Sequence, residues 1–351
     1  MYKIQTLNKI SSFGLDKFDA AKYEVADKIE NPDAILVRSA AMHDMELGDN
    51  LLAIARAGAG VNNIPVDRCS EQGIVVFNTP GANANAVKEL VIAALLLSSR
   101  RIPDALIWAQ TLKGKGDEVG KLVEKGKSAF VGPEICGKKL GVIGLGAIGV
   151  MAANTAEHLG MEVYGYDPYL SVKAAWGLSS SVHYAKSLRD IYENCDYISL
   201  HVPLNAETKG MINSEALASM KDDVRIINLA RGELVNDTDI IAALESGKAA
   251  QYVTDFPSDT VLGAKNVIAL PHLGASTPES EDNCATMAAA ELIEYLENGN
   301  ILNSVNLPNA EMVAEGDAKV CVIHKNVVAR VTNITGRISD MGLNIENMIN
   351  K

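Results

Sequence analysis

The feature that most constrains the fold is a glycine-rich turn between two apolar segments near the middle of the 351-residue chain. Residues 139–143 (KLGVI) have the composition of a buried strand, and GLGAIG at 144–149 follows directly. Residues 150–159 have helical composition, and a second apolar segment at 161–166 ends in Asp167. A GxGxxG pattern alone indicates only a tight turn, but strand, glycines, helix, strand and acid in this order predict a dinucleotide-binding unit.

Each glycine of this turn has a separate role in such a unit. Gly144 permits the turn, Gly146 lets the backbone approach a pyrophosphate, and Gly149 lets the helix pack close to the strand. Ala147 and Ile148 should supply the unpaired N–H groups that the helix N-terminus presents to phosphate. Asp167 can accept hydrogen bonds from ribose hydroxyls and would repel a 2′-phosphate, so the sequence predicts NAD rather than NADP.

Along most of the chain, apolar segments of strand length alternate with longer segments of helical period. This is the pattern of a parallel sheet covered by helices, so the fold class is α/β. Ligand groups in such sheets collect after the carboxyl ends of the strands. The residues expected to face the cofactor there are Val202 and Pro203 after 197–200, Ala230 after 225–229, and Gly274 and Ala275 after 267–270.

Composition excludes several other classes of function. Lys and Arg total 32 against 44 Asp and Glu, and this net charge of −12 repels nucleic acid and anionic membranes, so neither is an expected partner. The longest apolar run, 90–97, is shorter than the ~20 residues of a membrane-spanning helix. The cysteines and histidines form no metal-binding pattern. We therefore expect a protein of the reducing cytoplasm without a metal site.

Four ordered motifs are more specific than the glycine turn alone. They are the glycine motif with Asp167, HVPLNAETKGMIN at 201–213, INLARGELV at 227–235 and ALPHLGAST at 269–277. Together they resemble those of the D-isomer-specific 2-hydroxyacid dehydrogenases, and most of all the members that oxidise 3-phospho-D-glycerate. The resemblance implies a Rossmann-type doubly wound parallel sheet, inserted in a second, smaller flavodoxin-like α/β domain that binds substrate.

The resemblance also implies where the domains divide. The expected parts are 1–85 and 276–307 for the substrate-binding domain, 86–275 for the NAD-binding domain between them, and 318–351 for a C-terminal module. Long helices are expected at 85–100 and 276–298, the second opened by Ser276 and Glu279 at capping-box spacing. Residues 113–132 should form a surface loop. Substrate would lie in a cleft between the domains, which hinge motion could close.

The C-terminal segment resembles part of an ACT domain, a regulatory unit that binds serine. Strand composition at 319–326, helical composition at 327–341 and a second strand at 342–345 would begin such a module. ACT domains are about twice this length, so we expect the module to be truncated, which argues against binding of an L-serine effector. The positions that match serine-binding residues are His324, Asn326 and Asn344.

The implied reaction needs a cation, a base and a nicotinamide. Arg231 fits the cation that holds the substrate carboxylate and polarises the C2 oxygen, because its planar guanidinium grips a carboxylate and keeps its charge. His272 fits the base that takes the C2 hydroxyl proton as hydride leaves. A carboxylate should hold the imidazole of His272 in its correct tautomer.

The chain departs from the family at this carboxylate. The family has an Asp after the strand and then a catalytic Glu before Pro, whereas this chain reads VTDFPSD. Matching Phe256 places Asp259 at the Glu position and Thr254 where an Asp normally contacts the nicotinamide amide. We expect Asp259 to partner His272 and Asp255 to lie near the nicotinamide, but which of the two carboxylates partners the histidine stays open.

Positions that line the substrate site in the family match Arg38, Ser39, Arg56, Gly58 and Asn83. Arg38 and Arg56 are the candidates for binding a substrate phosphate. The expected activity is NAD-dependent oxidation of 3-phospho-D-glycerate to 3-phosphooxypyruvate, the first step of serine synthesis, in a homodimer or homotetramer. The alternatives are a reductase of hydroxypyruvate, glyoxylate or 2-oxoglutarate, and an NAD-sensing interaction protein on the same fold.

Overall fold

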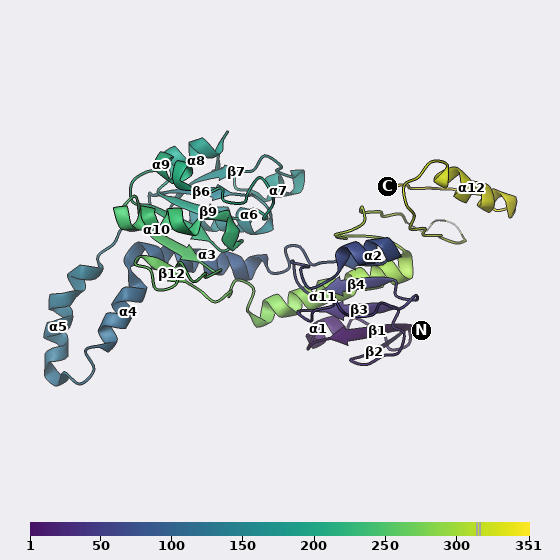
Figure 1. The fold of residues 1–351 in the computed structure, drawn as a ribbon, viewed down its shortest axis with the longest axis horizontal. Helices are drawn as coiled ribbons and strands as arrows, with labels where there is room; N and C mark the ends of the chain where they lie inside the picture. Colours follow the sequence, from purple (N-terminus) through teal and green to yellow (C-terminus); the bar gives the residue numbers. More distant parts are fainter. Residues whose placement is uncertain (314, 316) are drawn as a thin grey trace. The chain divides into compact units, whose positions relative to one another are not determined.

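The chain forms two compact units. A computed structural model describes residues 1–313, 315 and 317–351. The outer unit comprises residues 1–83 and 277–351, and the inserted unit comprises residues 84–276 (Figure 1). The chain therefore passes between the units twice, at 83/84 and at 276/277, one or two residues from the breaks expected at 85/86 and 275/276.

A parallel sheet of five strands in the order β2-β1-β3-β4-β5 forms the centre of the outer unit. Its strands are β1 (Tyr2–Leu7), β2 (Tyr23–Ala26), β3 (Ala34–Val37), β4 (Ala53–Arg56) and β5 (Val75–Phe77). The helices of this unit are α1 (Ser12–Leu15), α2 (Val66–Gln72), α11 (Pro278–Asn298) and α12 (Arg330–Asp340). Alternate strand residues face opposite sides, so that Ala53 packs in a core with Leu292 of α11, whereas Ile54 packs with Cys69 of α2.

Seven parallel strands form the sheet of the inserted unit, in the order β12-β11-β10-β9-β6-β7-β8. They are β6 (Lys139–Ile143), β7 (Glu162–Tyr166), β8 (His183–Tyr184), β9 (Tyr197–Leu200), β10 (Val224–Asn228), β11 (Ala249–Thr254) and β12 (Val267–Ala269). The sequence direction reverses between β6 and β9, which confirms the doubly wound α/β sheet. Ligands of such sheets bind at this reversal.

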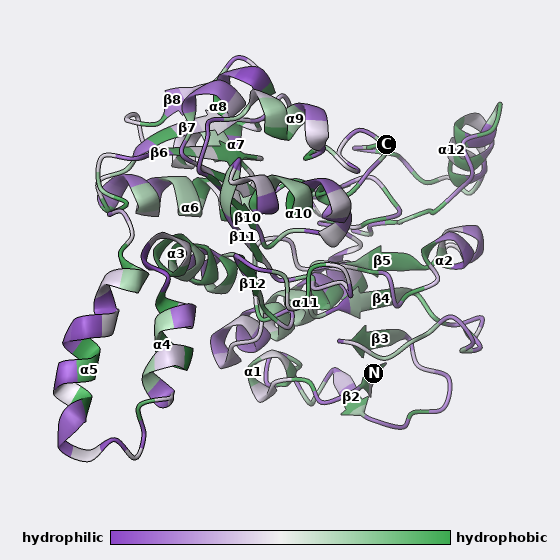
Figure 2. Cartoon of the chain, turned by 60° about the vertical axis from the view of Figure 1, so that its left-hand side comes forward, coloured by the Kyte–Doolittle hydropathy of each residue, from purple (hydrophilic) through white to green (hydrophobic). Residues whose placement is uncertain are grey.

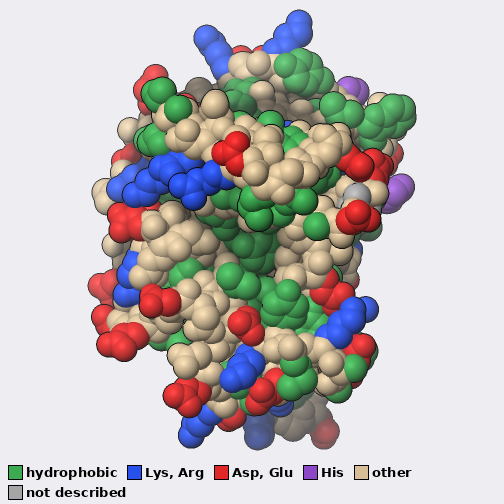
Figure 3. Space-filling model, turned by 90° about the vertical axis from the view of Figure 1, so that its right-hand side faces the viewer, with side chains coloured by type: hydrophobic (Ala, Val, Ile, Leu, Met, Phe, Trp, Pro, Cys, Tyr) green, Lys and Arg blue, Asp and Glu red, His purple; other side chains and the backbone are tan. Residues whose placement is uncertain are grey.

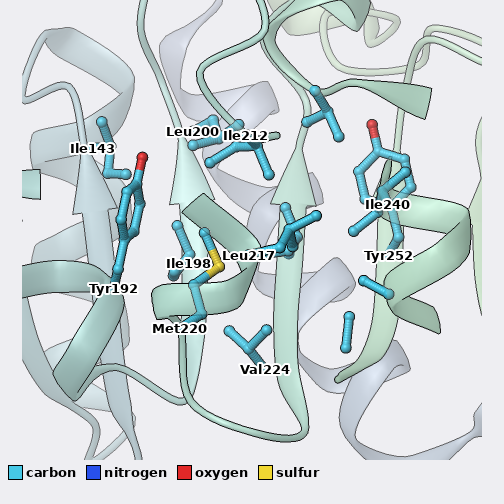
Figure 4. Close-up of a cluster of buried hydrophobic side chains, with 14 of the residues drawn as sticks. Ile143, Tyr192, Ile198, Leu200, Ile212, Leu217, Met220, Val224, Ile240 and Tyr252 are labelled. Carbon is cyan, nitrogen blue, oxygen red and sulfur yellow. The ribbon is translucent and has the colours of Figure 1, made fainter. Parts of the chain in front are cut away.

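Helices cover both faces of this sheet. They are α3 (Ala84–Arg100), α4 (Ile102–Gln110), α5 (Val119–Gly126), α6 (Ala147–His158), α7 (Val172–Gly177), α8 (Leu188–Asn194), α9 (Ser214–Ser219) and α10 (Asp237–Ser246), with 3-10 turns at Gly116–Glu118, Lys127–Phe130 and Gly232–Leu234. Tyr192 of α8, Leu217 of α9 and Ile240 of α10 share one core (Figure 4). Val91 of α3 and Ala153 of α6 belong to the core of the other face.

The segment at 113–132 is not the loop that its Lys and Gly content predicted. It contains α5, which runs beside α4 (Figures 1 and 2). The ring centroids of Trp108 and Phe130 lie 5.3 Å apart, and a Cβ at Gly126 would lie 2.3 Å from the Trp108 ring. This contact between the Trp108 ring on α4 and Gly126 on α5 stabilises the pair of helices, which the composition of the segment does not predict.

The start of α11 also differs from expectation. Its N-cap is Thr277, whose side chain accepts a hydrogen bond from the Ser280 N–H at 3.1 Å. Pro278 takes the first helical position, where a missing N–H leaves no bond unmade, and this fixes the cap one residue after the expected Ser276. Ser276 instead closes a turn, donating its backbone N–H to the Leu273 carbonyl.

The C-terminal segment forms the expected helix but not the expected strands. The helix α12 lies within 327–341, whereas 319–326 and 342–345 contain no strand, so the ACT-like module is not formed here. A strand requires a neighbour for its backbone hydrogen bonds, and among the described residues neither segment has one. Most of this segment is exposed.

Acidic and basic side chains are both present on the face that Figure 3 shows, with apolar side chains between them. In the described part of the chain, no helix combines the length and apolar character needed to cross a membrane.

Candidate active site

Six strands of the inserted unit end at one level of the sheet. Residues near their carboxyl ends are paired in the order Ala269, Thr254, Asn228, Leu200, Ile143 and Tyr166. Every residue that the sequence assigns to the cofactor or to the chemistry follows one of these positions within six residues. The sheet thus gathers these turns along one edge.

The glycine turn after β6 has the geometry that its sequence predicts. Gly144 has φ +93°, and a Cβ there would lie 2.7 Å from the His201 carbonyl oxygen. A Cβ at Gly149 would lie 1.9 Å from the Gly144 carbonyl oxygen. Any side chain at these two positions would displace backbone, so both require glycine.

The N-terminus of α6 is open and fits a pyrophosphate. Gly146 is its N-cap and gives no side-chain hydrogen bond, and a Cβ there would meet no atom within 4 Å. Among the described residues, no acceptor is recorded for the N–H groups of Ala147 and Ile148. These donors and the positive end of the helix dipole suit a phosphate.

Asp167 connects the end of β7 to the glycine turn. One carboxylate oxygen accepts the Leu145 N–H and the other accepts the Tyr169 N–H, each at 2.8 Å. Each oxygen of an ionised carboxylate has a second lone pair, so Asp167 can still accept from a ribose hydroxyl.

The turn that carries Arg231 is held by a buried amide that the sequence argument missed. Asn228 is fully buried; its Nδ2 donates to the Arg231 carbonyl at 2.8 Å, and its Oδ1 accepts the Ala230 N–H at 3.3 Å. The Arg231 side chain is exposed, and its Nη1 donates to the Ala230 carbonyl at 2.6 Å. A polar residue directly after the apolar pair Ile226 and Ile227, at the end of the strand before Arg231, was the available signal.

Phe256 connects the Arg231 turn with His272. The rings of Phe256 and His272 pack with centroids 4.6 Å apart. On the other turn, a Cβ at Gly232 would lie 3.3 Å from the Phe256 Cβ. The turn after β10 and the imidazole after β12 therefore contact the same residue, which follows the strand between them.

Asp255 lies beneath the turn that carries His272. It is 1% exposed, and its two oxygens accept the N–H groups of Leu273 and Gly274, each at 2.7 Å. His272 itself is exposed and has φ +56°, a left-handed conformation that is strained for a residue with a side chain. The Asp255 carboxylate therefore stabilises a strained turn, and its expected contact with the nicotinamide stays a prediction.

The expected pair of Asp259 and His272 is not formed in this structure. Asp259 is exposed, and across the described ranges no hydrogen bond or ion pair joins it to the imidazole. The neighbouring Thr254 is buried, and its Oγ1 accepts the Phe256 N–H at 3.1 Å. The role of Asp259 as the partner of His272 remains a prediction.

The other expected cofactor positions line the same edge. A Val202 methyl carbon would lie 2.9 Å from a Cβ at Gly144, and Pro203 accepts a hydrogen bond from the Thr208 hydroxyl at 2.6 Å. Gly274 lies directly on Asp255, and Ala275 follows it in the same turn.

His201, beside Val202, does not fit acid–base work near neutral pH. Burial lowers the pKa of His201 to about 4. Its Nε2 lies 2.9 Å from the Ser199 hydroxyl, so the neutral ring is hydrogen-bonded to the strand that precedes the turn.

The substrate residues of the outer unit follow its strands in the same way. Val37 of β3 is in register with Arg56 of β4, and Arg38 follows Val37 directly. Arg56 Nε donates to the Arg38 carbonyl at 3.0 Å, and its guanidinium lies over Gly58, where a Cβ would be 2.5 Å from Nη1. Arg38 Nη2 lies 2.5 Å from Oε1 of Glu281 on α11, an ion pair that the sequence argument missed.

Asn8 holds the turn after β3. Its side-chain oxygen accepts the N–H groups of Ser39 and Ala40 at 2.9 and 2.7 Å, and its own φ is +73°. Those two N–H groups therefore already have an acceptor. Asn83 is partly buried at the last position before the inserted unit.

The expected effector residues are not brought together. His324 Nε2 lies 3.2 Å from the Asn350 side-chain oxygen, and within the described residues no hydrogen bond joins His324 to Asn326 or Asn344. The described part of the chain also contains no group of three or more His, Cys, Asp or Glu residues that could hold a metal ion.

Comparison with known proteins identifies the family. Residues 92–274 match the profile of the D-isomer specific 2-hydroxyacid dehydrogenase, NAD binding domain. The chain belongs to the D-isomer-specific 2-hydroxyacid dehydrogenase family. Its inserted unit contains the NAD-binding domain of that family, in agreement with the open glycine turn and the placement of Asp167.

Relatives within the family include several D-3-phosphoglycerate dehydrogenases. The chain is 31% identical to that of Bacillus subtilis, covering all of this chain and 68% of the relative. It is 34% identical to that of Methanocaldococcus jannaschii, covering 92% of this chain and 60% of the relative. For the Rattus norvegicus protein the values are 32%, 83% and 54%. The chain thus spans between about half and two thirds of these relatives.

Solved structures share the fold. An NAD+-bound 3-phosphoglycerate dehydrogenase of Entamoeba histolytica is 26% identical with a TM-score of 0.68, covering 87% of this chain and 99% of the other. The holo form of Rhodotorula graminis D-mandelate dehydrogenase has a TM-score of 0.74 at 22% identity, covering 89% and 99%. At that identity the second likeness concerns the fold alone.

Proposed function

We propose that this chain oxidises 3-phospho-D-glycerate to 3-phosphooxypyruvate with NAD, the first step of L-serine synthesis. The single observation that carries the proposal is the convergence of the Arg231 turn and the His272 ring on Phe256, at the edge where the glycine turn opens. The D-3-phosphoglycerate dehydrogenases among the relatives support the choice of substrate.

The reaction removes a hydride from C2 of the substrate and a proton from its hydroxyl group, leaving a carbonyl. When bound, NAD supplies the ring that accepts the hydride. Arg231 holds the substrate carboxylate and the C2 oxygen, because a guanidinium can donate to both and stays charged. His272 takes the hydroxyl proton. We further propose that Asp259 moves to the imidazole and orients it in the substrate complex.

Binding of the cofactor and the phosphate uses residues at the strand ends. The N–H groups of Ala147 and Ile148 bind the pyrophosphate, and Asp167 accepts from the adenosine ribose. In the outer unit, Arg38 and Arg56 bind the substrate phosphate. The five cysteines are free thiols, which supports a cytoplasmic location. We also propose that the chain forms a homodimer or homotetramer.

One observation favours a second candidate function. The pairing of Arg38 with Glu281 places a carboxylate beside the proposed phosphate site. A substrate without a phosphate avoids this repulsion, so a reductase of hydroxypyruvate, glyoxylate or 2-oxoglutarate is the alternative.

Measuring NADH formation and consumption across phosphorylated and unphosphorylated 2-hydroxy and 2-oxo acids tests the proposal. We expect the highest kcat/KM for 3-phospho-D-glycerate, and we expect His272→Ala to lower kcat by about 10²- to 10⁴-fold without loss of NAD affinity. Higher kcat/KM for the unphosphorylated acids would select the reductase. If the chain binds NAD but turns over none of the acids, the result would instead favour an NAD-sensing protein.

A further inference from the structure

Arg38 is already engaged by a carboxylate of its own unit. Its Nη2 lies 2.5 Å from Oε1 of Glu281, and both side chains are 42% exposed. Exposed ion pairs of this kind shift an equilibrium by less than about fivefold, so a ligand can exchange for one partner. Glu281 lies in the first turn of α11. The pair is therefore a solvent-accessible contact between a helix and the end of β3.

The same strand ends carry a second cation. Arg56 ends β4, which pairs with β3, and its Nε donates to the Arg38 carbonyl at 3.0 Å. Gly58 leaves the space that the Arg56 guanidinium fills. Arg38, which pairs with Glu281, and Arg56 therefore place two guanidinium groups at neighbouring strand ends.

We propose that Glu281 is a specificity-determining residue that competes with the anionic group of the substrate for Arg38. A phosphate then binds Arg38 only by displacing the Glu281 carboxylate, and a dianion is also repelled by that carboxylate more strongly than a neutral group is. The chain thereby favours unphosphorylated acids more than its arginines alone would. The inference rests on the proposed function only in taking Arg38 as a substrate-binding residue.

Titration of the full-length chain without NAD tests the competition directly. The probes are inorganic phosphate and 3-phospho-D-glycerate, with D-glycerate as the unphosphorylated match. The variant Glu281→Gln should bind both phosphate probes about threefold to fivefold more tightly than the unaltered chain does. Its affinity for D-glycerate should stay within about twofold of that of the unaltered chain. The matched control is Glu279→Gln, which removes the same charge from the same helical turn. Glu279 is exposed and has no ion pair recorded in the described residues, so this control should match the unaltered chain.

A double-mutant cycle separates competition for Arg38 from a general loss of negative charge. In an Arg38→Ala background, Glu281→Gln should give no gain in phosphate affinity, because the residue for which Glu281 competes is absent. Melting temperatures show whether each variant is folded. The proposal would be overturned if Glu281→Gln and Glu279→Gln bound phosphate with equal affinity. It would also be overturned if the gain in phosphate affinity persisted in the Arg38→Ala background, or if the affinity for D-glycerate rose equally.

Turnover measurements distinguish this inference from the proposed function. In an active enzyme, Glu281→Gln should lower KM for 3-phospho-D-glycerate by the same factor while kcat changes less than about twofold. If no acid is turned over but the phosphate gain is present, the proposed function fails and the competition stands. If turnover is normal and the gain is absent, the competition fails and the function stands.

Discussion

At the scale of single residues, the site depends on polar side chains, two of them buried, that hold the backbone of the turns carrying the candidate residues. Asn228 holds the Arg231 turn, Asp255 holds the His272 turn, and Asn8 holds the turn after β3. Each uses a side-chain oxygen or amide to satisfy backbone groups that the turn leaves unpaired. Asn228 and Asp255 shape the site while buried beneath it, whereas Asn8 is exposed.

The Asp255 contacts give a testable prediction. Asp255→Asn replaces one acceptor oxygen with a donor that faces an N–H group, so the His272 turn should lose one charge-assisted bond and gain a repulsive contact. We expect a loss of about 1.5–3 kcal/mol in the free energy of unfolding and a fall in kcat of at least about tenfold. Thermal unfolding and steady-state kinetics measure the two effects. The contrasting variant is Asp259→Asn, which should leave stability unchanged because Asp259 is exposed. An equal loss of unfolding free energy in both variants would contradict the supporting role given to Asp255 alone.

Sequence patterns identified the residues that would bind the cofactor or take part in the reaction. They did not identify the residues that hold those residues in place. The spacing of Gly144, Gly146 and Gly149 follows from steric requirements that hold in any such turn, so their roles could be predicted. Asp255 could not be separated from Asp259, because four residues of irregular chain decide which carboxylate points under the turn. Glu281 was missed because its partner Arg38 is 243 residues away in the sequence.

At the scale of elements, strands and helices with strong patterns form close to the expected residues. Residues 139–143 and 197–200 are strands with the expected bounds. Boundaries shift where a local group decides them, as Pro278 does for α11. The two strands expected in the C-terminal segment are missing. A strand forms only beside another strand that accepts and donates its backbone hydrogen bonds, and strand composition does not supply that partner.

The observed cap of α11 predicts a difference between two adjacent residues. Thr277→Ala removes the side-chain acceptor of the Ser280 N–H and should lower the free energy of unfolding by about 1 kcal/mol. Ser276→Ala, at the cap expected from the sequence, should change it by less than about 0.5 kcal/mol. Denaturant unfolding of both variants measures the difference. A larger loss at Ser276 would mean that the helix begins one residue earlier.

Glu291 gives the outer unit a dependence on pH. This residue of α11 is 6% exposed; its Oε1 accepts from the Asn303 amide at 2.8 Å, and no partner of Oε2 is found in the described chain. Burial raises the pKa of Glu291 to about 8, against a smaller lowering by the Asn303 hydrogen bond. The folded state therefore holds a proton that the unfolded state releases above its usual pKa of 4.5.

Stability should fall as pH rises from the unfolded pKa toward about 8 and level off above it, because the folded state binds more protons in that window. Glu291→Gln replaces the carboxyl group with an amide of similar size that does not ionise. We expect the variant to be more stable than the unaltered chain at pH 8 by on the order of a few kcal/mol, and similar at pH 4.5. Unfolding free energies at the two pH values measure this, and parallel pH profiles for the two proteins would contradict it.

At the scale of the whole molecule, each unit has a sheet with cores on both faces. The inserted unit contains its own clusters around Ile198 and around Val142, and the outer unit contains clusters around Leu36 and around Ile54. A unit that buries both faces of its sheet has the core that independent folding needs. The double passage of the chain was implied by the resemblance to the family, which places the NAD-binding domain between two segments of the substrate-binding domain.

Residues 84–276 produced alone should therefore fold and bind NAD with a Kd within about tenfold of that of the full chain, because every proposed cofactor residue lies in this unit. The same fragment should lack dehydrogenase activity, because Arg38 and Arg56 belong to the outer unit. Calorimetric titration with NAD and an NADH assay measure the two properties. A fragment that unfolds or fails to bind NAD would show that the outer unit is needed for the cofactor site.

Six strands of the inserted unit end at one level of the sheet. This arrangement affects how the substrate preference of such an enzyme can change. The exposed residues of these turns are attached to strands whose packing does not depend on their identity. Substrate preference can therefore be altered by exchanging short connections, one at a time, while the central layer keeps its sequence. For an engineer, the positions to vary are the other residues of the turns after β10, β11 and β12, with Arg231, Asp255, His272 and the strands beneath them left unchanged.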